Sequence, residues 1–237
     1  MNKQEALATL ARNRQEAQRS GYRNIGDYHG GAYECLHVSP YTKSAGNVDA
    51  DIMVLLQDWT SDEFIRGPLG AGVVALGYTE GLPTNKNLSR LLREHFNVSL
   101  GETFATNLFP FIKPGDMGQR IPQRDLVQAG IEFALPQVRI IKPKLMICLG
   151  LQTYNAIRQS CGERCVSRLP EAINLPFTFE GTRIWCQAHT GGRGQAMRGK
   201  VKVAEDWRWM SDDLGFSRLS GPEIDLRRQA AWALACG

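Results

Sequence analysis

The chain has 237 residues, of which 43% are hydrophobic and 22% charged, and its formal net charge is +4. This length and composition are typical of a globular protein with a substantial core and fit one large domain, or at most two small ones. No apolar run is long enough to cross a bilayer, and the charge is too small to call for a nucleic-acid partner by itself.

The N-terminal part divides into a helix and an irregular segment. Residues 1–20 place Leu7 and Leu10 on one side of a helix and charged residues on the other, whereas residues 21–50 are rich in Gly, Tyr, Ser and Pro. We therefore expect residues 1–45 to form a helical and irregular extension ahead of the first strand. The N-terminus lacks the apolar region of a signal peptide, so a cytoplasmic location is expected.

Apolar runs and helical repeats alternate along the rest of the chain. The runs predict strands within residues 52–61, 102–111, 143–150 and 182–192. Helical spacing is found within residues 85–96, 123–141, 151–159 and 221–237, and Pro136 should kink or restart the second of these helices. This alternation indicates an α/β fold, a three-layer α/β/α sandwich with a mainly parallel central sheet of about four strands, and we expect a single domain over residues 1–237.

Three polar residues, Asp58, Asn107 and His189, each follow an apolar, strand-like run. The carboxyl ends of parallel strands share one edge of a sheet, which is where ligands bind in such folds. Taken alone, Asp58 could instead cap the next helix and His189 could be a buried structural histidine. Their common position at strand ends favours a functional site.

A basic, glycine-rich stretch follows the last predicted strand. Residues 189–203 contain Arg193, Arg198, Lys200 and Lys202 and no acidic residue. Such a loop can approach phosphate with both backbone amides and cationic side chains. The alternative is a solvated surface loop.

Several of these stretches resemble the motifs of one family. "LLQDWTS", "FATNLFPF" and "QAHTGG" occur in the order and at approximately the spacing of the three site motifs of the uracil-DNA glycosylase superfamily. "LPTNKNLSRLL" resembles the segment that touches DNA phosphate in that family, and "PQVRIIKPKLMICLG" resembles its passage from helix to strand. The resemblance covers residues 48–205 and is specific because several short motifs agree in order.

The resemblance implies a role for each strand-end residue. Asp58 would stabilise the oxocarbenium-like sugar and activate or orient water, as carboxylates do in glycoside hydrolysis. His189 would donate to the departing base oxygen, helped by the backbone amide of Gln57. The Asn107 amide would pair with the edge of a flipped pyrimidine and so distinguish uracil from cytosine.

The resemblance also implies DNA contacts and a wall for the base. Thr84 and Thr190 stand where the family places phosphate contacts, and Arg193 lies near the wedge that enters the duplex. Arg198 and Lys200 extend this DNA-binding surface. Tyr78 is expected to stack on the flipped base, although an ordinary packed tyrosine is an equal alternative.

The chain departs from the family at several positions. The best-known branch has Pro-Tyr after its Gln-Asp, and that tyrosine excludes thymine; here the positions hold Trp59, placed with the base-binding residues, and Thr60. Thr190 and Gly191 replace the Pro-Ser that usually follows the histidine. Other branches bind an iron-sulfur cluster through cysteines near the asparagine strand.

The six cysteines argue against a cofactor. None lies between Cys35 and Cys148, and Cys161 and Cys165 lack a second pair at metal-site spacing. We expect reduced thiols, no iron-sulfur cluster, no metal and no cofactor.

The sequence therefore predicts a monofunctional DNA glycosylase, a hydrolase of base excision repair that releases uracil or a related deaminated base. We expect DNA with a damaged base as the partner, no membrane association, and a monomer. No lysine is placed for a Schiff base, so lyase activity is not expected. One alternative is a superfamily member that binds nucleic acid or nucleotides without cleaving them. An enzyme of small nucleotides is a weaker alternative, because no P-loop or G-x-G-x-x-G follows the first strand.

Overall fold

The computed structural model describes residues 2–215, so the helix expected within residues 221–237 lies outside the described residues. Its centre is a five-stranded sheet in the order β2-β1-β3-β5-β4. The strands are β1 (Ile52–Asp58), β2 (Phe104–Phe109), β3 (Leu145–Leu149), β4 (Phe177–Phe179) and β5 (Thr182–Gln187). The first four in this order pair in parallel, and only β4 is antiparallel to its neighbour.

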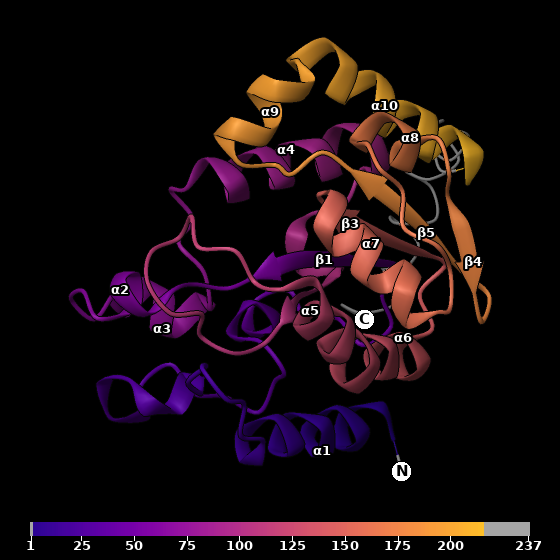
Figure 1. Ribbon diagram of the computed structural model, residues 1–237. Helices are drawn as coiled ribbons and strands as arrows, with labels where there is room; N and C mark the ends of the chain where they lie inside the picture. Colours follow the sequence, from indigo (N-terminus) through magenta and orange to yellow (C-terminus); the bar gives the residue numbers. More distant parts are fainter. Residues whose placement is uncertain (1, 216–237) are drawn as a thin grey trace, which may run out of the picture.

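Helices cover both faces of the sheet, which confirms the predicted three-layer α/β/α architecture. Figure 1 shows α4 and α10 on one side of the sheet and α1, α5 and α6 on the other. The longer helices are α1 (Lys3–Glu16), α4 (Pro83–Phe96), α5 (Gln123–Ala129), α6 (Leu135–Ile141), α7 (Leu151–Ser160) and α10 (Lys200–Asp213). Helix α9 (Gly192–Arg198) is as long as α5 and α6, and the shorter helices are α2 (Asp62–Ile65), α3 (Ala71–Leu76) and α8 (Leu169–Ile173).

The alternation of side chains along β1 determines the direction of its last residue. Val54 and Leu56 pack in the core cluster under α4 and α10, whereas Met53 and Leu55 belong to the cluster on the other face. Because successive residues of a strand point to opposite faces, Asp58 projects on the α4 side. The continuous apolar run thus indicates a strand buried on both faces, as the sequence predicted.

Pro136 restarts a helix as expected. Helix α5 ends at Ala129, one π-helical turn (Gly130–Ala134) follows, and α6 begins at Leu135 with Pro136 in its first turn. Proline lacks a backbone N–H and its ring crowds the preceding turn, so a regular α-helix cannot run through this position unchanged.

The segment between α1 and β1 lies along the outer side of β2, which is an edge strand. Ala105 N–H donates to Ala45 O at 2.7 Å, and Ile112 N–H donates to Arg23 O at 2.8 Å, just beyond the strand. An uncovered edge would leave backbone groups unpaired. The extension expected over residues 1–45 therefore covers the edge of the sheet at β2 and supplies hydrogen-bond acceptors there.

Strand β4 was not predicted. It has three residues, none of them buried, and a tight turn at Glu180 and Gly181, which have φ of 47° and 87°, joins it to β5. A half-exposed strand of this length carries too little hydrophobic pattern to be recognised.

Candidate functional site

Asp58 and Asn107 lie on the same face of the sheet, at the ends of neighbouring strands. The register pairs Leu56 with Asn107 and Asp58 with Phe109. Side chains directly opposite each other in a ladder share a face, so Asn107 points to the α4 side as Leu56 and Asp58 do. Asn107 is 1% exposed, and the Asp58 side chain is 9% exposed.

Both carboxylate oxygens of Asp58 accept hydrogen bonds from side chains. Lys113 Nζ lies 2.9 Å from Oδ2, and Gln57 Nε2 donates to Oδ1 at 3.0 Å. Helix α2 has Ser61 at its N-cap position, so the alternative that Asp58 caps this helix is wrong. The carboxylate instead belongs to a buried polar cluster.

Lys113 is the residue that sequence reasoning missed. Lys113 is 3% exposed and pairs with Asp58, whereas the sequence analysis assigned no lysine to the strand-end site. The chain after β2 continues beside the chain after β1: Ser61 bridges to Lys113, and Asp62 N–H donates to Lys113 O at 2.8 Å. A lone lysine inside the apolar run "FPFIKPG" is the signal that could have found it.

A second bond fixes the Lys113 ammonium. Nζ donates to Met117 O at 2.7 Å, from the turn that follows. The charge therefore has a carboxylate and a carbonyl as partners, as a buried cation requires.

Two hydroxyls next to Asp58 are buried without a partner. Thr60 Oγ1 and Ser61 Oγ find no hydrogen-bond partner among residues 2–215. Unsatisfied buried hydroxyls are costly and mark places where a polar ligand can bind. They lie two and three positions after the carboxylate in the sequence.

His189 follows β5 and is held by the loop that it opens. Gly191 N–H donates to His189 Nδ1 at 3.0 Å, so in the neutral ring the proton sits on Nε2. Burial lowers the pKa of His189 below its usual 6.5, while the negative charge of Asp58 acts in the opposite direction. His189, at the end of β5, and Asp58, at the end of β1, thus influence each other electrostatically.

The loop after His189 needs its glycines. A Cβ on Gly194 would lie 2.3 Å from His189 O, and one on Gly191 would lie 2.9 Å from His189 Nδ1. Gln195 Nε2 also donates to His189 O at 3.3 Å. The backbone thus folds closely around the histidine.

Thr84 and Thr190 lie close together, but their exposure differs. Asn87 Nδ2 donates to Thr190 O at 2.8 Å, and Thr84 Oγ1 would lie 3.1 Å from a Cβ on Gly191. Thr84 is half-buried, whereas the Thr190 side chain is fully buried and its hydroxyl has no partner among the described residues. A phosphate can approach Thr84 as the structure stands, but Thr190 only through movement of the loop.

Tyr78 and Trp59 pack against aromatic neighbours. Tyr78 stacks on Tyr41 with ring centroids 4.9 Å apart and an interplanar angle of 23°. Trp59 Nε1 donates to Gly77 O at 2.7 Å, and its ring meets Tyr33 edge-on at 5.4 Å. The packed alternative for Tyr78 is therefore present in the structure, and Trp59 anchors the turn that carries Tyr78.

The basic stretch is not the open loop expected from its glycines, because residues Gly192–Arg198 form α9 and α10 begins at Lys200. Arg198 makes a two-pronged ion pair with Asp206, at 2.7 and 2.8 Å, which ties α9 to α10. Arg193 and Lys200 are exposed. These two cations are free to meet a polyanion, whereas Arg198 already has a partner.

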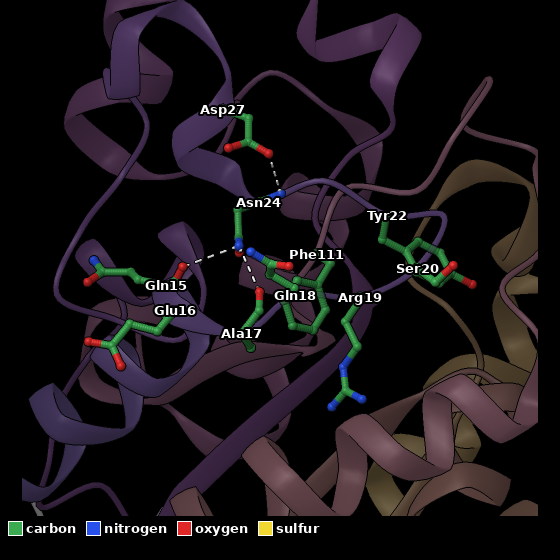
Figure 2. Close-up of a pocket in the computed structure, with 10 residues that line it drawn as sticks. All are labelled: Gln15, Glu16, Ala17, Gln18, Arg19, Ser20, Tyr22, Asn24, Asp27 and Phe111. Atoms are coloured by element: carbon green, nitrogen blue, oxygen red, sulfur yellow. Dashed lines mark hydrogen bonds between the residues drawn. The ribbon is translucent and has the colours of Figure 1, made fainter.

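A separate hollow lies at the end of α1, away from the strand-end residues. It has a volume of about 610 Å³, and Figure 2 shows the side chains that line it, among them Arg19, Asn24 and Phe111. Asn24 Nδ2 bridges the carbonyls of Gln15 and Ala17 there. Neither Asp58, Asn107 nor His189 contributes to this hollow.

The part of the chain that the structure describes contains neither a cluster of metal ligands nor a helix that could span a membrane. Among residues 2–215, no group of three or more His, Cys, Asp or Glu side chains is arranged to hold a metal ion. Within the same residues, no helix has both the length and the apolar character required to cross a membrane. The absence of a cofactor stays a prediction.

Comparison with known proteins finds similarity to a uracil-DNA glycosylase. No family model matches the chain. A curated type-4 uracil-DNA glycosylase from Pyrobaculum aerophilum is 28% identical over 109 residues, which cover 42% of this chain and 54% of the relative. The chain thus spans about half the length of that relative. Together with the α/β fold and the three strand-end motifs, this similarity supports membership of the uracil-DNA glycosylase superfamily.

Proposed function

We propose that the protein is a DNA glycosylase that hydrolyses the N-glycosidic bond of uracil or a related deaminated base in DNA. One observation carries the proposal: a carboxylate, an amide and a neutral imidazole come from the ends of three different strands to one edge of the sheet. Each of these groups can assist the loss of a base by hydrolysis.

Asp58 is proposed to act on the sugar. As the bond to the base breaks, positive charge develops on the sugar ring, and a nearby carboxylate stabilises it and orients the attacking water. The unpartnered hydroxyls of Thr60 and Ser61, which follow Asp58 closely in the chain, suit the polar groups of a nucleotide or the water itself.

His189 is proposed to act on the leaving base. Negative charge collects on the oxygen of the departing base, and a fixed neutral donor stabilises it without a proton transfer. The bond from Gly191 N–H to Nδ1 leaves Nε2–H as the donor, and the lowered pKa keeps the ring neutral at physiological pH. The Gln57 backbone amide is the second proposed donor.

Asn107 is proposed to read the base, with Tyr78 and Trp59 at the wall of its pocket. For DNA, Thr84 and the exposed Arg193 and Lys200 are the favoured contacts. Arg198 and Thr190 support that surface from within, through the pair with Asp206 and the bond from Asn87.

The reaction is proposed to be hydrolysis alone, by a monomeric enzyme of base excision repair. Lys113 lies near enough to suggest a covalent role, but its ammonium is held by Asp58 and Met117 O. A nucleophilic lysine must present a free amine. Lys113 is therefore assigned to the support of Asp58.

One observation favours the alternative of a binding protein without catalysis. The lysine neutralises the charge of Asp58, and both carboxylate oxygens already accept hydrogen bonds. A carboxylate has further lone pairs for water, so we prefer catalysis.

The deciding experiment is base release from oligonucleotides with uracil, hypoxanthine, xanthine or mismatched thymine, in single and double strands. Release by the wild type, lost in Asp58→Asn and reduced about 100-fold or more in His189→Ala, is expected. Asp51→Asn, an exposed aspartate ahead of β1 that pairs with Lys144, is the matched control and should keep full activity. DNA binding by folded protein without any release would establish the binding alternative.

A further inference from the structure

A serine from outside the sheet contacts the amide that is proposed to read the base. Ser39 Oγ donates to Asn107 Oδ1 at 2.5 Å, across 68 positions of the sequence. Ser39 is 0% exposed and Asn107 is 1% exposed. This bond is therefore shielded from solvent.

The hydrogen bonds around Ser39 determine the orientation of the Asn107 amide, that is, whether Oδ1 or Nδ2 faces the Ser39 hydroxyl. Tyr41 N–H donates to Ser39 Oγ at 3.3 Å, so the hydroxyl oxygen acts as an acceptor on that side. The single hydroxyl hydrogen must then find an acceptor of its own, and Asn107 Oδ1 is the one that the structure provides. A reversed amide would place an N–H against the hydroxyl and leave its hydrogen unsatisfied.

Ser39 is held in place by its neighbours. It is the N-cap of a short 3-10 helix (Pro40–Lys43) in which Thr42 Oγ1 donates to Ala105 O at 2.9 Å. Tyr41 of the same turn donates to Asn85 Oδ1 at 2.7 Å and stacks on Tyr78. The turn is thereby tied to β2, to α4 and to the proposed base-stacking residue.

We propose that Ser39 is a positioning residue that fixes Asn107 with its amide nitrogen directed at the flipped base. The inference rests on the proposed function of the same site. With Oδ1 held by Ser39, Nδ2 finds no acceptor among the described residues and is the donor left for a ligand. The second lone pair of Oδ1 remains available to accept a ring N–H.

This orientation defines a class of bases. A base with a keto oxygen beside a ring N–H fits the donor and acceptor of the amide, and uracil, hypoxanthine and xanthine all have this edge. Cytosine and adenine present an amino group and an unprotonated ring nitrogen, so donor would meet donor and acceptor would meet acceptor. Ser39 thus links the segment before β1 to the choice of uracil over cytosine and of hypoxanthine over adenine. Thymine and guanine share the keto edge, so this contact does not distinguish them from the deaminated bases.

The test compares Ser39→Ala with Ser39→Thr, which keeps the hydroxyl, and with Thr42→Val, which removes a neighbouring buried hydroxyl that bonds only to backbone. Two readouts are needed: kcat/KM for release from uracil and hypoxanthine oligonucleotides, and Kd for oligonucleotides with a non-cleavable 2′-fluoro-deoxyuridine against 2′-fluoro-deoxycytidine. Urea unfolding of each variant reports on folding.

Ser39→Ala is expected to lower the uracil-to-cytosine binding ratio about tenfold and kcat/KM by a similar factor. Ser39→Thr should restore both, and Thr42→Val should keep the ratio even where it lowers stability. An unchanged ratio in folded Ser39→Ala, with an active wild type, would overturn the role of Ser39 and leave the glycosylase intact. A Ser39-dependent ratio without any base release would uphold Ser39 and refute catalysis. No preference in the wild type would overturn the inference outright.

Discussion

Lys113 Nζ lies 2.9 Å from Asp58 Oδ2, and the two side chains are 4% and 9% exposed. The pair joins the segment after β2 to the end of β1. A buried ion pair adds little stability compared with apolar groups of the same size, but removal of one partner leaves an uncompensated charge. The site therefore depends on both partners.

Lys113→Met should lower the free energy of unfolding by about 3 kcal/mol, because Asp58 is left charged and buried. The double variant Lys113→Met/Asp58→Asn should recover much of this loss. Urea denaturation of the wild type, both single variants and the double variant measures the coupling. Additive effects of the two substitutions would show that the pair does not interact in solution.

Lys113 should not form a covalent intermediate. Incubation of the protein with a preformed abasic site and borohydride is expected to trap no complex, since the ammonium is engaged by Asp58 and Met117 O. Preformed abasic DNA makes this result independent of base release. A trapped complex that disappears in Lys113→Arg would reverse the assignment and make the enzyme bifunctional.

The pH dependence of base release should report His189. Burial lowers its pKa below 6.5, so the neutral donor persists at pH 6.5 and is lost only as the pH falls through the lowered pKa. Single-turnover rates should stay level to below pH 6.5 and then decline. His189→Gln, which cannot be protonated, should be slower and lack this decline; an identical acid limb in both proteins would assign it to another group.

The lowered pKa of His189 should also make the folded protein less stable as the pH falls. Below pH 6.5 the histidine of the unfolded chain binds a proton that the folded protein resists, so folding stability decreases as the pH falls. Urea unfolding between pH 7 and 5 should show a shallower decline for His189→Gln than for the wild type. Equal slopes would contradict the burial of a neutral ring.

Gly194→Ala should disturb the histidine loop, because the new Cβ would lie 2.3 Å from His189 O. We expect a loss of about 2 kcal/mol in stability and a fall in kcat, typical of a backbone clash. Gly192→Ala is the matched control, since no atom lies within 4 Å of its Cβ position. Equal activity of the two variants would show that the loop is free to rearrange.

The exposed and paired arginines should respond differently to salt. Arg193→Ala and Lys200→Ala should each reduce the slope of log K against log salt for duplex DNA by about 0.9 for each phosphate that the variant no longer neutralises. Arg198→Ala should instead lower stability, because it leaves Asp206 without its guanidinium partner. Binding titrations over a range of salt, together with thermal unfolding, separate the two effects. A salt slope that changes only in Arg198→Ala would show that Arg198 contacts the DNA and that Arg193 and Lys200 do not.

Local patterns in the sequence were sufficient for the parallel α/β sheet and for the position of Asp58. The apolar run of β1 indicates burial on both faces and places Asp58 at the carboxyl end of the strand, whereas the packing of the two core clusters shows that Asp58 points to the α4 side. The sequence also predicted that a helix restarts at Pro136, because the missing backbone N–H is a property of proline itself and needs no tertiary contact. The half-exposed β4 was missed because three residues carry too little pattern.

Tertiary structure alone decided the partners of the strand-end residues. Lys113 reaches Asp58 because two chain segments run on side by side beyond their strands, and Ser39 reaches Asn107 because the segment before β1 covers the edge of β2. Neither contact has a periodic signal in the sequence, since each joins residues far apart in the chain. Burial then makes these contacts decisive, because a charge or a hydroxyl removed from water must find its partner within the protein.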